Sequence, residues 1–591
     1  MSGLTSCAVY EKYCNRLFLN SNATFLCERL EAEEEKSASS LQWLASCYLR
    51  QGEAKRAYTV LEGRASTDEL RYLLAIACLK LEKPHEAEIA LLPDRNLRVL
   101  GPKAGTTALL SVVPQGAAGF YALGEACRQT HRREAAIGYM ELSLQQDPLM
   151  WVAFEALCAM GAEPDANTYF KIKQGHPVID VHAVCGPSYF DAAQVPTPAT
   201  QRKPSEQVGS TRRLLDFGST DASSTQKPPS KIPRTHFNQT REEKVQESSS
   251  DNNYQGVVST LLLVLSKLGT ARAALAKNDI KRALSSLHSL SPRHFETGWV
   301  QHALGRCHFE AADYEAAVDA LRSMRRVEPH RIKGLELLST ALWHLKDEVE
   351  LCYLSRAAVD FDPRAPESWC CAGNCLSLQK EHDAAVRCFQ RAIALDPTFA
   401  YAFTLCGHEY AANDDLDHAL AMYRHALRAD DRHYNAWYGI GAIHFRQEKF
   451  DLAEYHFQRA LSLNPQSSVL HCHIGMTHHA NGNFDQALAY LRQAAELEPK
   501  NPQARFQTAN VLISLDHCEE ALAELSIVAD YAPREASVHF LMGKVCKKLD
   551  RLSEAMMHFT YALDLQPKDN NLIKSAIDRL EEPDIDEEEK F

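Results

Sequence analysis

The sequence predicts an all-α protein in which pairs of helices stack into a superhelix. Small residues return every 34 positions, as Gly373, Gly407, Gly441, Gly475, Ala509 and Gly543. Twelve residues after each lies an alanine, from Ala385 to Ala555, and a large apolar residue follows four positions later, from Phe389 to Phe559. A fixed period of this length indicates repeats that stack on one another.

The spacing has a physical reason. Two antiparallel helices of about a dozen residues each, with their turns, use roughly 34 residues. A small residue is required where the two helices cross closely, and the large apolar residue fills the space beside it. Proline ends most units, because it lacks an N–H and starts a helix better than it continues one; the closing residues are Pro397, Asp431, Pro465, Pro499, Pro533 and Pro567.

These positions carry the signature of the tetratricopeptide repeat, in which Trp369, Trp437 and Tyr410 also occupy the expected aromatic positions. A single helical pair cannot bury its apolar face, so the units must stack and leave a concave groove along one side. We therefore predict a tetratricopeptide-repeat superhelix in two arrays that are separated by a disordered linker.

The pattern divides the 591 residues into four parts. Residues 1–168 hold a degenerate N-terminal array of about four helical pairs, in which the loop from Leu92 to Gly116 breaks the register. Residues 256–574 hold the C-terminal array, with about nine pairs, and residues 575–591 form an acidic tail. Between the arrays, residues 169–255 are rich in Ser, Thr, Pro and Gln and have few apolar residues, which predicts disorder.

Two short motifs lie in this linker. Thr197 precedes a proline and so forms a minimal proline-directed phosphorylation site. Arg213, Leu215 and Phe217 form an Arg-x-Leu-x-Phe pattern similar to the docking motif that cyclins recognise. Both motifs are short, and a solvated tether that carries them by chance is the competing interpretation.

Composition excludes several classes of function. The net charge is −13 and no basic stripe stands out, so we expect no nucleic-acid partner. The N-terminus does not resemble a signal peptide and no window approaches a membrane span, so we expect no membrane association and a location in the nucleus and cytoplasm. The 18 cysteines are scattered through the repeat helices and are expected to be reduced thiols.

No enzyme signature accompanies the repeats, and the chain is predicted to be non-catalytic and without a cofactor. His471, His473, His478 and His479 lie close to Cys472, which is a combination of zinc-ligand types. They fall along one predicted helix and point in several directions, so packed or groove-lining histidines are the preferred interpretation and no metal is expected.

The groove is the predicted functional site. In tetratricopeptide proteins the first helix of each pair lines the concave face through its second, fifth, ninth, twelfth and thirteenth residues. Asparagine there can hydrogen-bond an extended peptide, and Arg or Lys can meet a terminal carboxylate. By register, the predicted groove residues are Asn374, His408, Tyr438, Phe445, Arg446, His479, Phe506, Asn510, Phe540 and Lys544.

The residues of the repeats resemble one particular family of tetratricopeptide proteins. The segment HYNAWYGIGAIHFRQEKFDLAEYHFQRALSLNPQSSVLHCHIG, with FLMGKVCKKL after it and CERLEAEEEKSASSLQWLASCYLRQGEAKRAY near the N-terminus, resembles the cell division cycle protein 27 family. That family supplies the third subunit of the anaphase-promoting complex. The linker resembles that of the family only in general composition, and it is poor in Ser-Pro and Thr-Pro.

The resemblance implies a non-catalytic scaffold of a mitotic ubiquitin ligase with other subunits of that complex as partners. It implies homodimerisation through the N-terminal array, and a C-terminal groove that captures Ile-Arg tails of coactivators and of the substrate-receptor core subunit. A ligand arginine calls for an acidic partner, for which Glu409, Asp414 and Asp415 are candidates. The alternatives are another tetratricopeptide subunit of the same complex, or a co-chaperone that binds acidic chaperone tails through successive basic groove positions. A repeat-bearing glycosyltransferase is disfavoured because no catalytic domain follows the repeats.

Overall fold

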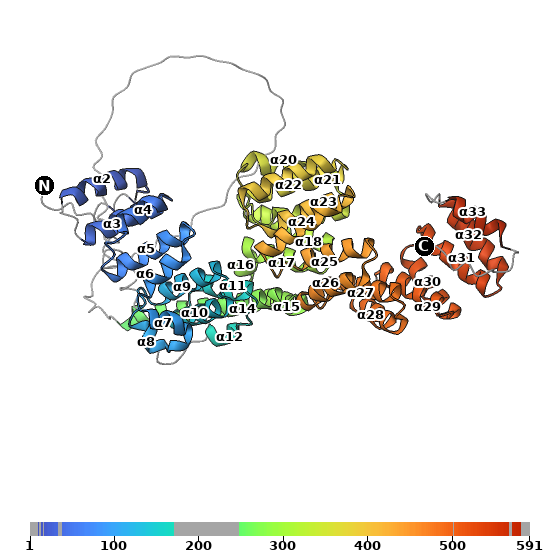
Figure 1. Cartoon of the computed structure of the whole chain (residues 1–591), viewed down its shortest axis with the longest axis horizontal. Helices are drawn as coiled ribbons and strands as arrows, with labels where there is room; N and C mark the ends of the chain where they lie inside the picture. Colours follow the sequence, from blue (N-terminus) through green and yellow to red (C-terminus); the bar gives the residue numbers. More distant parts are fainter. Residues whose placement is uncertain are drawn as a thin grey trace, which may run out of the picture. The chain divides into compact units, whose positions relative to one another are not determined.

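The computed structural model describes Tyr10, Cys14, Asn15 and residues 17–33, 38–170, 248–499, 501–565 and 570–580, and these residues form helices and turns with no strand. The N-terminal array contains α2 (Asn20–Glu33), α3 (Ala38–Arg50), α4 (Ala54–Leu61), α5 (Asp68–Lys80), α6 (Pro84–Leu91), α7 (Arg95–Leu100), η2 (Gly101–Ala104), α8 (Thr106–Leu110), α9 (Ala117–Gln129), α10 (Arg133–Gln146), α11 (Trp151–Ala159) and α12 (Ala166–Tyr169). The predicted loop from Leu92 to Gly116 therefore holds three short helices (Figure 1).

The C-terminal array consists of antiparallel pairs that follow one another along the chain (Figure 1). Its helices are α14 (Ser248–Ala276), α15 (Ile280–His288), α16 (Pro292–Phe295), α17 (Gly298–Glu310), α18 (Tyr314–Val327), α19 (Leu335–Leu345), α20 (Glu348–Phe361), α21 (Pro366–Leu378), α22 (His382–Leu395), α23 (Ala400–Ala412), α24 (Leu416–Ala429), α25 (Tyr434–Arg446), α26 (Phe450–Leu463), α27 (Ser468–Ala480), α28 (Phe484–Leu497), α29 (Pro502–Ser514), α30 (Cys518–Tyr531), α31 (Ala536–Lys548), α32 (Leu552–Asp564) and α33 (Asn570–Asp578).

The small residues lie where the two helices of a pair cross. A Cβ added at Gly407 would come within 2.7 Å of the Tyr423 ring, and one at Gly441 within 2.7 Å of the Phe457 ring. Both rings are buried in the centre of their repeats, so they have no space into which to move. The periodic Gly positions are therefore steric requirements of helix packing.

The turn inside each pair is also periodic. The residue that follows the first helix by two positions has a positive φ, as at Lys380 (64°), Asp414 (64°) and Glu448 (59°), and this left-handed position recurs at the same 34-residue step. In some repeats the second helix begins after an aspartate whose side chain accepts the backbone N–H three residues on, as at Asp313 and Asp415. Glycine, which this conformation favours, occupies the position at Gly52, Gly161 and Gly482.

The two arrays pack against each other. Trp151 of α11 and Trp299 of α17 are in edge-to-face contact with ring centroids 5.8 Å apart. A Cβ on Gly269 of α14 would meet Ala166 and Phe170 at 2.9 Å. The described parts of residues 1–171 and 262–591 accordingly belong to one compact unit, so the stack continues from α11 to α14 across the linker.

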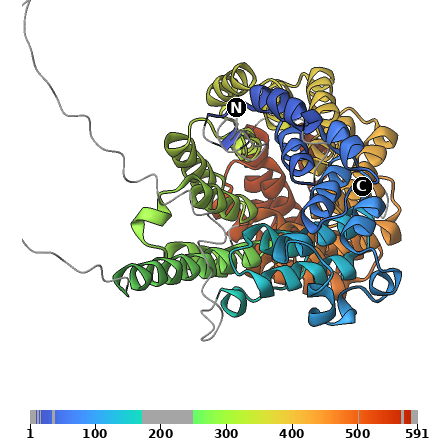
Figure 2. The same ribbon diagram turned by 90° about the vertical axis from the view of Figure 1, so that its left-hand side faces the viewer.

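Helix α14, the long green helix in Figure 2, requires a correction to the membrane analysis. Its window Ser259–Ala276 is long and apolar enough to cross a bilayer by length and composition, which contradicts the expectation that no window approaches a span. Ala271, Ala274 and Leu275 from this window are buried against α15 and α17. Packing within the repeats accounts for the apolar face of the C-terminal half of the helix.

Contacts between repeats that are distant in sequence fix the coil of the C-terminal array. The Asn278 side chain donates to the Leu463 carbonyl at 2.9 Å, and Arg432 donates to the Ala276 carbonyl at 3.2 Å. Tyr434 donates its hydroxyl to Glu310 at 2.7 Å. The turn after α14 and the helix α17 are thereby held beside α25 and α26.

Gly441→Ala is expected to lower the midpoint of thermal unfolding of the full chain. Helix propensity alone would favour the alanine by about 1 kcal/mol, whereas the clash with Phe457 costs about 1–3 kcal/mol. The double variant with Phe457→Leu should recover part of the loss, because Ala509 already faces Leu525 in the equivalent positions. A single variant that is as stable as the parent chain would contradict the steric account.

Candidate functional site

The groove is built by the first helices α21, α23, α25, α27, α29 and α31, which carry the ten groove residues predicted from register. Consecutive first helices place equivalent positions side by side, so the residues form a line along the array. The line extends over six repeats, and a short peptide can therefore touch only part of it. The structure separates the predicted residues into four groups with different surroundings.

Asn374 and Glu409, at one end of the line, are engaged within the fold. The Asn374 amide donates to Ser339 Oγ at 2.8 Å and to Thr340 Oγ1 at 2.9 Å, and the side chain is buried. Glu409 is also buried and accepts from Ser377 Oγ and from His382 Nδ1, both at 2.7 Å. These two residues connect neighbouring repeats.

His408 and Tyr438 pair with aromatic partners. His408 is exposed to solvent, and its Nδ1 shares a hydrogen bond of 2.8 Å with the Tyr423 hydroxyl. The Tyr438 hydroxyl shares a hydrogen bond of 3.0 Å with His473 Nε2, and its ring packs beside Phe457. Both side chains are thus held in fixed orientations on the concave side.

Phe445, Arg446 and His479 lie at the ends of α25 and α27. Phe445 is partly buried and packs in a T-shaped contact with Phe450. Arg446 donates to Asp414 Oδ1 at 2.8 Å and to the Ala411 carbonyl, and this ion pair is exposed. His479 Nε2 shares a hydrogen bond of 3.0 Å with Ser514 Oγ.

The last group lies on α29 and α31 and combines partly exposed side chains with the exposed Lys544. Phe506 and Phe540 are partly exposed, and the Lys544 ammonium lies 4.9 Å from the centre of the Phe540 ring. The Asn510 amide donates only to Gln507 of its own helix among the hydrogen bonds seen, at 3.1 Å. Two aromatic surfaces, an amide and a cation therefore face the groove from adjacent first helices.

The sequence prediction missed several groove residues. Tyr401, at the second position of α23, shares a hydrogen bond of 2.7 Å with Thr340. Glu336, at the fifth position of its repeat, is buried and accepts the Gly334 N–H at 2.7 Å. Burial, together with the nearby Glu367 carboxylate, raises the pKa of Glu336 to about 7. The same register rule would have found both residues if it had been applied to every position.

Other predicted sites fall outside this groove. Thr197, Arg213, Leu215 and Phe217 lie outside the described residues. Within the ranges that the structure covers, no three His, Cys, Asp or Glu side chains are grouped as a metal site needs. Instead His471 contacts the Pro465 carbonyl while His479 contacts Ser514, in different directions.

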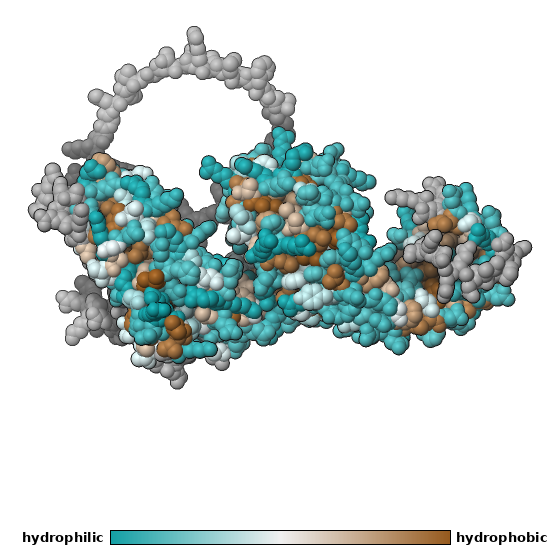
Figure 3. Space-filling view, in the orientation of Figure 1, coloured by the Kyte–Doolittle hydropathy of each residue, from teal (hydrophilic) through white to brown (hydrophobic). Residues whose placement is uncertain are grey.

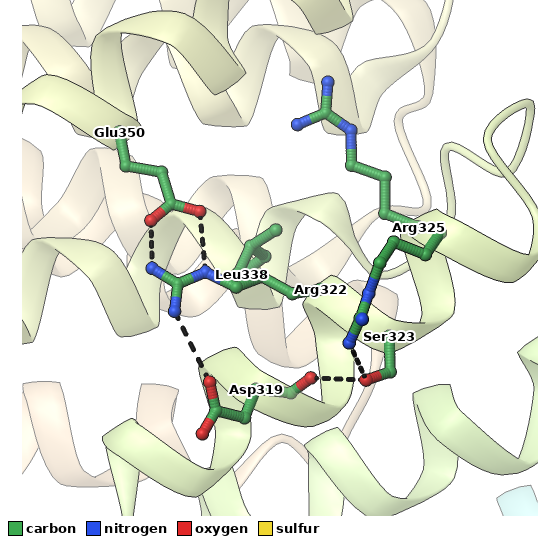
Figure 4. Close-up of a pocket in the computed structure, with 7 residues that line it drawn as sticks. Asp319, Arg322, Ser323, Arg325, Leu338 and Glu350 are labelled. Atoms are coloured by element: carbon green, nitrogen blue, oxygen red, sulfur yellow. Dashed lines mark hydrogen bonds and ion pairs between the residues drawn. The ribbon is translucent and has the colours of Figure 1, made fainter. Parts of the chain in front are cut away.

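A cavity of about 720 Å³ opens between the second helices α18 and α20 (Figure 4). Arg322 spans it and makes two hydrogen bonds with the Glu350 carboxylate, while a third reaches Asp319 at 3.4 Å. Because this guanidinium is already neutralised by two carboxylates, the cavity is best explained as a surface depression bridged by ion pairs between successive repeats.

The helical pairs, the 34-residue step and the groove define a tetratricopeptide-repeat protein. Tetratricopeptide models match residues 366–399, 434–467 and 478–545. The model of anaphase-promoting complex, cyclosome, subunit 3 matches residues 17–93. The crystal structure of the APC/C hetero-tetramer Cut9–Hcn1 is similar in fold, with a TM-score of 0.61, 15% sequence identity and coverage of 97% of this chain and 95% of that one.

Two relatives match most of the chain. Cell division cycle protein 27 homolog B from Arabidopsis thaliana is 31% identical over 557 residues, which cover 66% of this chain and 73% of that protein. Anaphase-promoting complex subunit 3 from Schizosaccharomyces pombe is 30% identical over 473 residues, with coverage of 68% and 70%. The chain belongs to the cell division cycle protein 27 family.

Glu409→Ala is expected to lower the thermal midpoint of the full chain, because Ser377 and His382 would lose their buried acceptor at a cost of about 1–3 kcal/mol. Asp414→Asn is the matched control, since asparagine tolerates the left-handed backbone at this position and the lost pair with Arg446 is exposed and contributes about 0–1 kcal/mol. Equal losses in the two variants would show that Glu409 does not stabilise the contact between repeats.

Proposed function

We propose that this chain is a non-catalytic scaffold subunit of the anaphase-promoting complex, a cell-cycle ubiquitin ligase, and that it works in the nucleus and cytoplasm. The observation that carries the proposal is the family membership, because the relatives are named for that complex or for the cell division cycle. A stack of repeats with one continuous groove is a suitable support for other subunits, because every repeat adds surface on which another chain can bind.

Within that role, the groove receives the Ile-Arg tails of coactivators and of the substrate-receptor core subunit. We place the end of the tail over α29 and α31, where Phe506 and Phe540 offer apolar surface for the isoleucine. Lys544 is exposed on the same face and suits the terminal carboxylate, and Asn510 suits the peptide backbone. Asn374, by contrast, already uses its amide hydrogens inside the fold.

A fluorescent peptide that ends in Ile-Arg with a free carboxylate should bind the full chain, as measured by fluorescence anisotropy. Lys544→Ala is expected to weaken binding roughly tenfold, because one charge-assisted hydrogen bond is worth about 1.5–3 kcal/mol. Lys281→Ala, an exposed lysine on the second helix α15, is the control.

An amidated peptide tests whether Lys544 is the residue that binds the terminal carboxylate. If Lys544 binds the carboxylate, amidation should weaken binding to the parent chain and have little further effect on Lys544→Ala. Independent, additive losses would place the carboxylate elsewhere. Indifference to the replacement of Ile-Arg by Ala-Ala would rule out tail recognition while leaving the family membership intact.

The N-terminal array is the proposed homodimer interface. Apolar side chains are exposed at its start, where Phe18 is 78% and Phe25 is 57% exposed, with Leu17 and Leu19 beside them. A second apolar patch lies over α7 and α8, as the brown surface in Figure 3 illustrates, and includes Val99 and Leu100. Exposed apolar surface of this kind favours association with another protein surface.

Sedimentation equilibrium of the full chain should give the mass of a dimer. Phe18→Glu combined with Phe25→Glu should shift the chain to the monomer, because charges would replace the apolar contact. Val349→Glu combined with Tyr353→Glu changes two equally exposed residues on α20 and should leave the dimer intact. A dimer that survives the first pair and not the second would place the interface on the C-terminal array.

A further inference from the structure

A second part of the groove lies where the two arrays meet. A pocket of about 450 Å³, here called the junction pocket, is lined by α9 and α11 of the N-terminal array, by α14 and α17, and by the segment that precedes α19. All four helices are first helices, so the pocket belongs to the concave face. Trp299, His302 and Arg306 line it from the second, fifth and ninth positions of their repeat, which are the register positions that define the groove.

Cations outnumber anions around the junction pocket. Arg128, Arg272, Arg306, Arg331 and Lys333 face Glu125 and Glu155. Glu125 is paired with Arg128 at 2.8 Å, and Arg331 is paired with Glu328 at 3.0 Å. These pairs leave the three cations Arg272, Arg306 and Lys333 against one remaining lining carboxylate, that of Glu155.

The three remaining cations are weakly engaged. Arg306 lies 4.0 Å from Glu310, whose carboxylate already accepts the Tyr434 hydroxyl. Among the residues described, neither Arg272 nor Lys333 has a side-chain hydrogen bond or ion pair. The three cations come from α14, from α17 and from the segment before α19, so three separate elements each contribute one cation to the lining.

His302 reports the local electrostatic potential. Burial, and then Arg331, Arg306 and Lys333, lower the pKa of His302 to about 3. Burial and the neighbouring Arg306 also lower the pKa of Arg272. The pocket is therefore electropositive within a chain whose net charge is −13.

The rest of the wall is apolar. Trp299, Leu275 and Ala303 line the pocket beside the cations. An occupant that fits must combine a compact anion with apolar groups next to it, which is the chemistry of an acidic or phosphorylated residue flanked by aliphatic side chains.

We propose that the junction pocket binds a phosphorylated serine or threonine in an extended segment of a partner chain. A phosphoryl group presents three acceptor oxygens and nearly two negative charges, which matches a pocket lined by cations from three separate elements. A single carboxylate presents its oxygens in one plane and carries one charge, so it would pair with only one or two of these cations. The proposal does not depend on the tail site on α29 and α31.

The test uses the full chain after phosphatase treatment and a fluorescein-labelled peptide, Gly-Ala-Leu-pThr-Leu-Ala-Gly, with fluorescence anisotropy as the readout. The phosphopeptide should bind, and the affinity should fall as salt is raised. Arg272→Ala and Arg306→Ala are each expected to weaken binding roughly tenfold. Arg282→Ala, an exposed arginine on the second helix α15, should have no effect.

If the Arg272→Ala variant does not fold, the Lys333→Ala variant still tests the proposal. Lys333 is exposed, so its loss should not disturb packing. Circular dichroism checks that each variant retains its helices. Equal binding of the unphosphorylated peptide would overturn the proposal, as would binding that survives all three substitutions. A peptide with Glu-Glu in place of pThr should bind more weakly, and equal affinity would assign the pocket to acidic peptides instead.

Discussion

The close crossing of the two helices in each repeat is the constraint on which the rest of the structure depends. Gly441 and Phe457 illustrate it, because the ring occupies the space that a Cβ would need. Once that contact sets the distance between the helices, the repeat length, the stacking step and the direction of each first helix follow. The groove exists because every repeat makes the same contact.

This constraint also explains what the sequence could predict. Steric contacts inside one repeat recur at fixed positions, so the all-α superhelix, the helical pairs and the line of first helices could be inferred from periodicity. The nine pairs from α14/α15 to α31/α32 agree with the count expected for the C-terminal array. The left-handed turns were not recognised, because Lys380 and Glu448 are not among the Gly, Asn and Asp residues that favour this conformation.

The candidate site was less predictable, because its chemistry depends on contacts between repeats. Position alone could not distinguish Asn374, whose amide donates to Ser339 and Thr340, from Asn510, whose amide donates to Gln507 of its own helix. Glu409 presented the same difficulty, since its partners lie 32 and 27 residues away in sequence. Periodicity shows which side chains face the groove, whereas their hydrogen-bonding partners decide which remain available to a ligand.

The composition of the chain also did not predict the positive charge of the junction pocket. The cations Arg272, Arg306 and Lys333 are separated in sequence and are diluted by the acidic surface elsewhere, so no basic stripe is visible in the chain. Folding brings them together because α14, α17 and the segment before α19 belong to successive repeats that line one pocket. A solenoid with a negative net charge can therefore hold a cationic site, since its local charge is set by the groove positions of adjacent repeats rather than by the average over the chain.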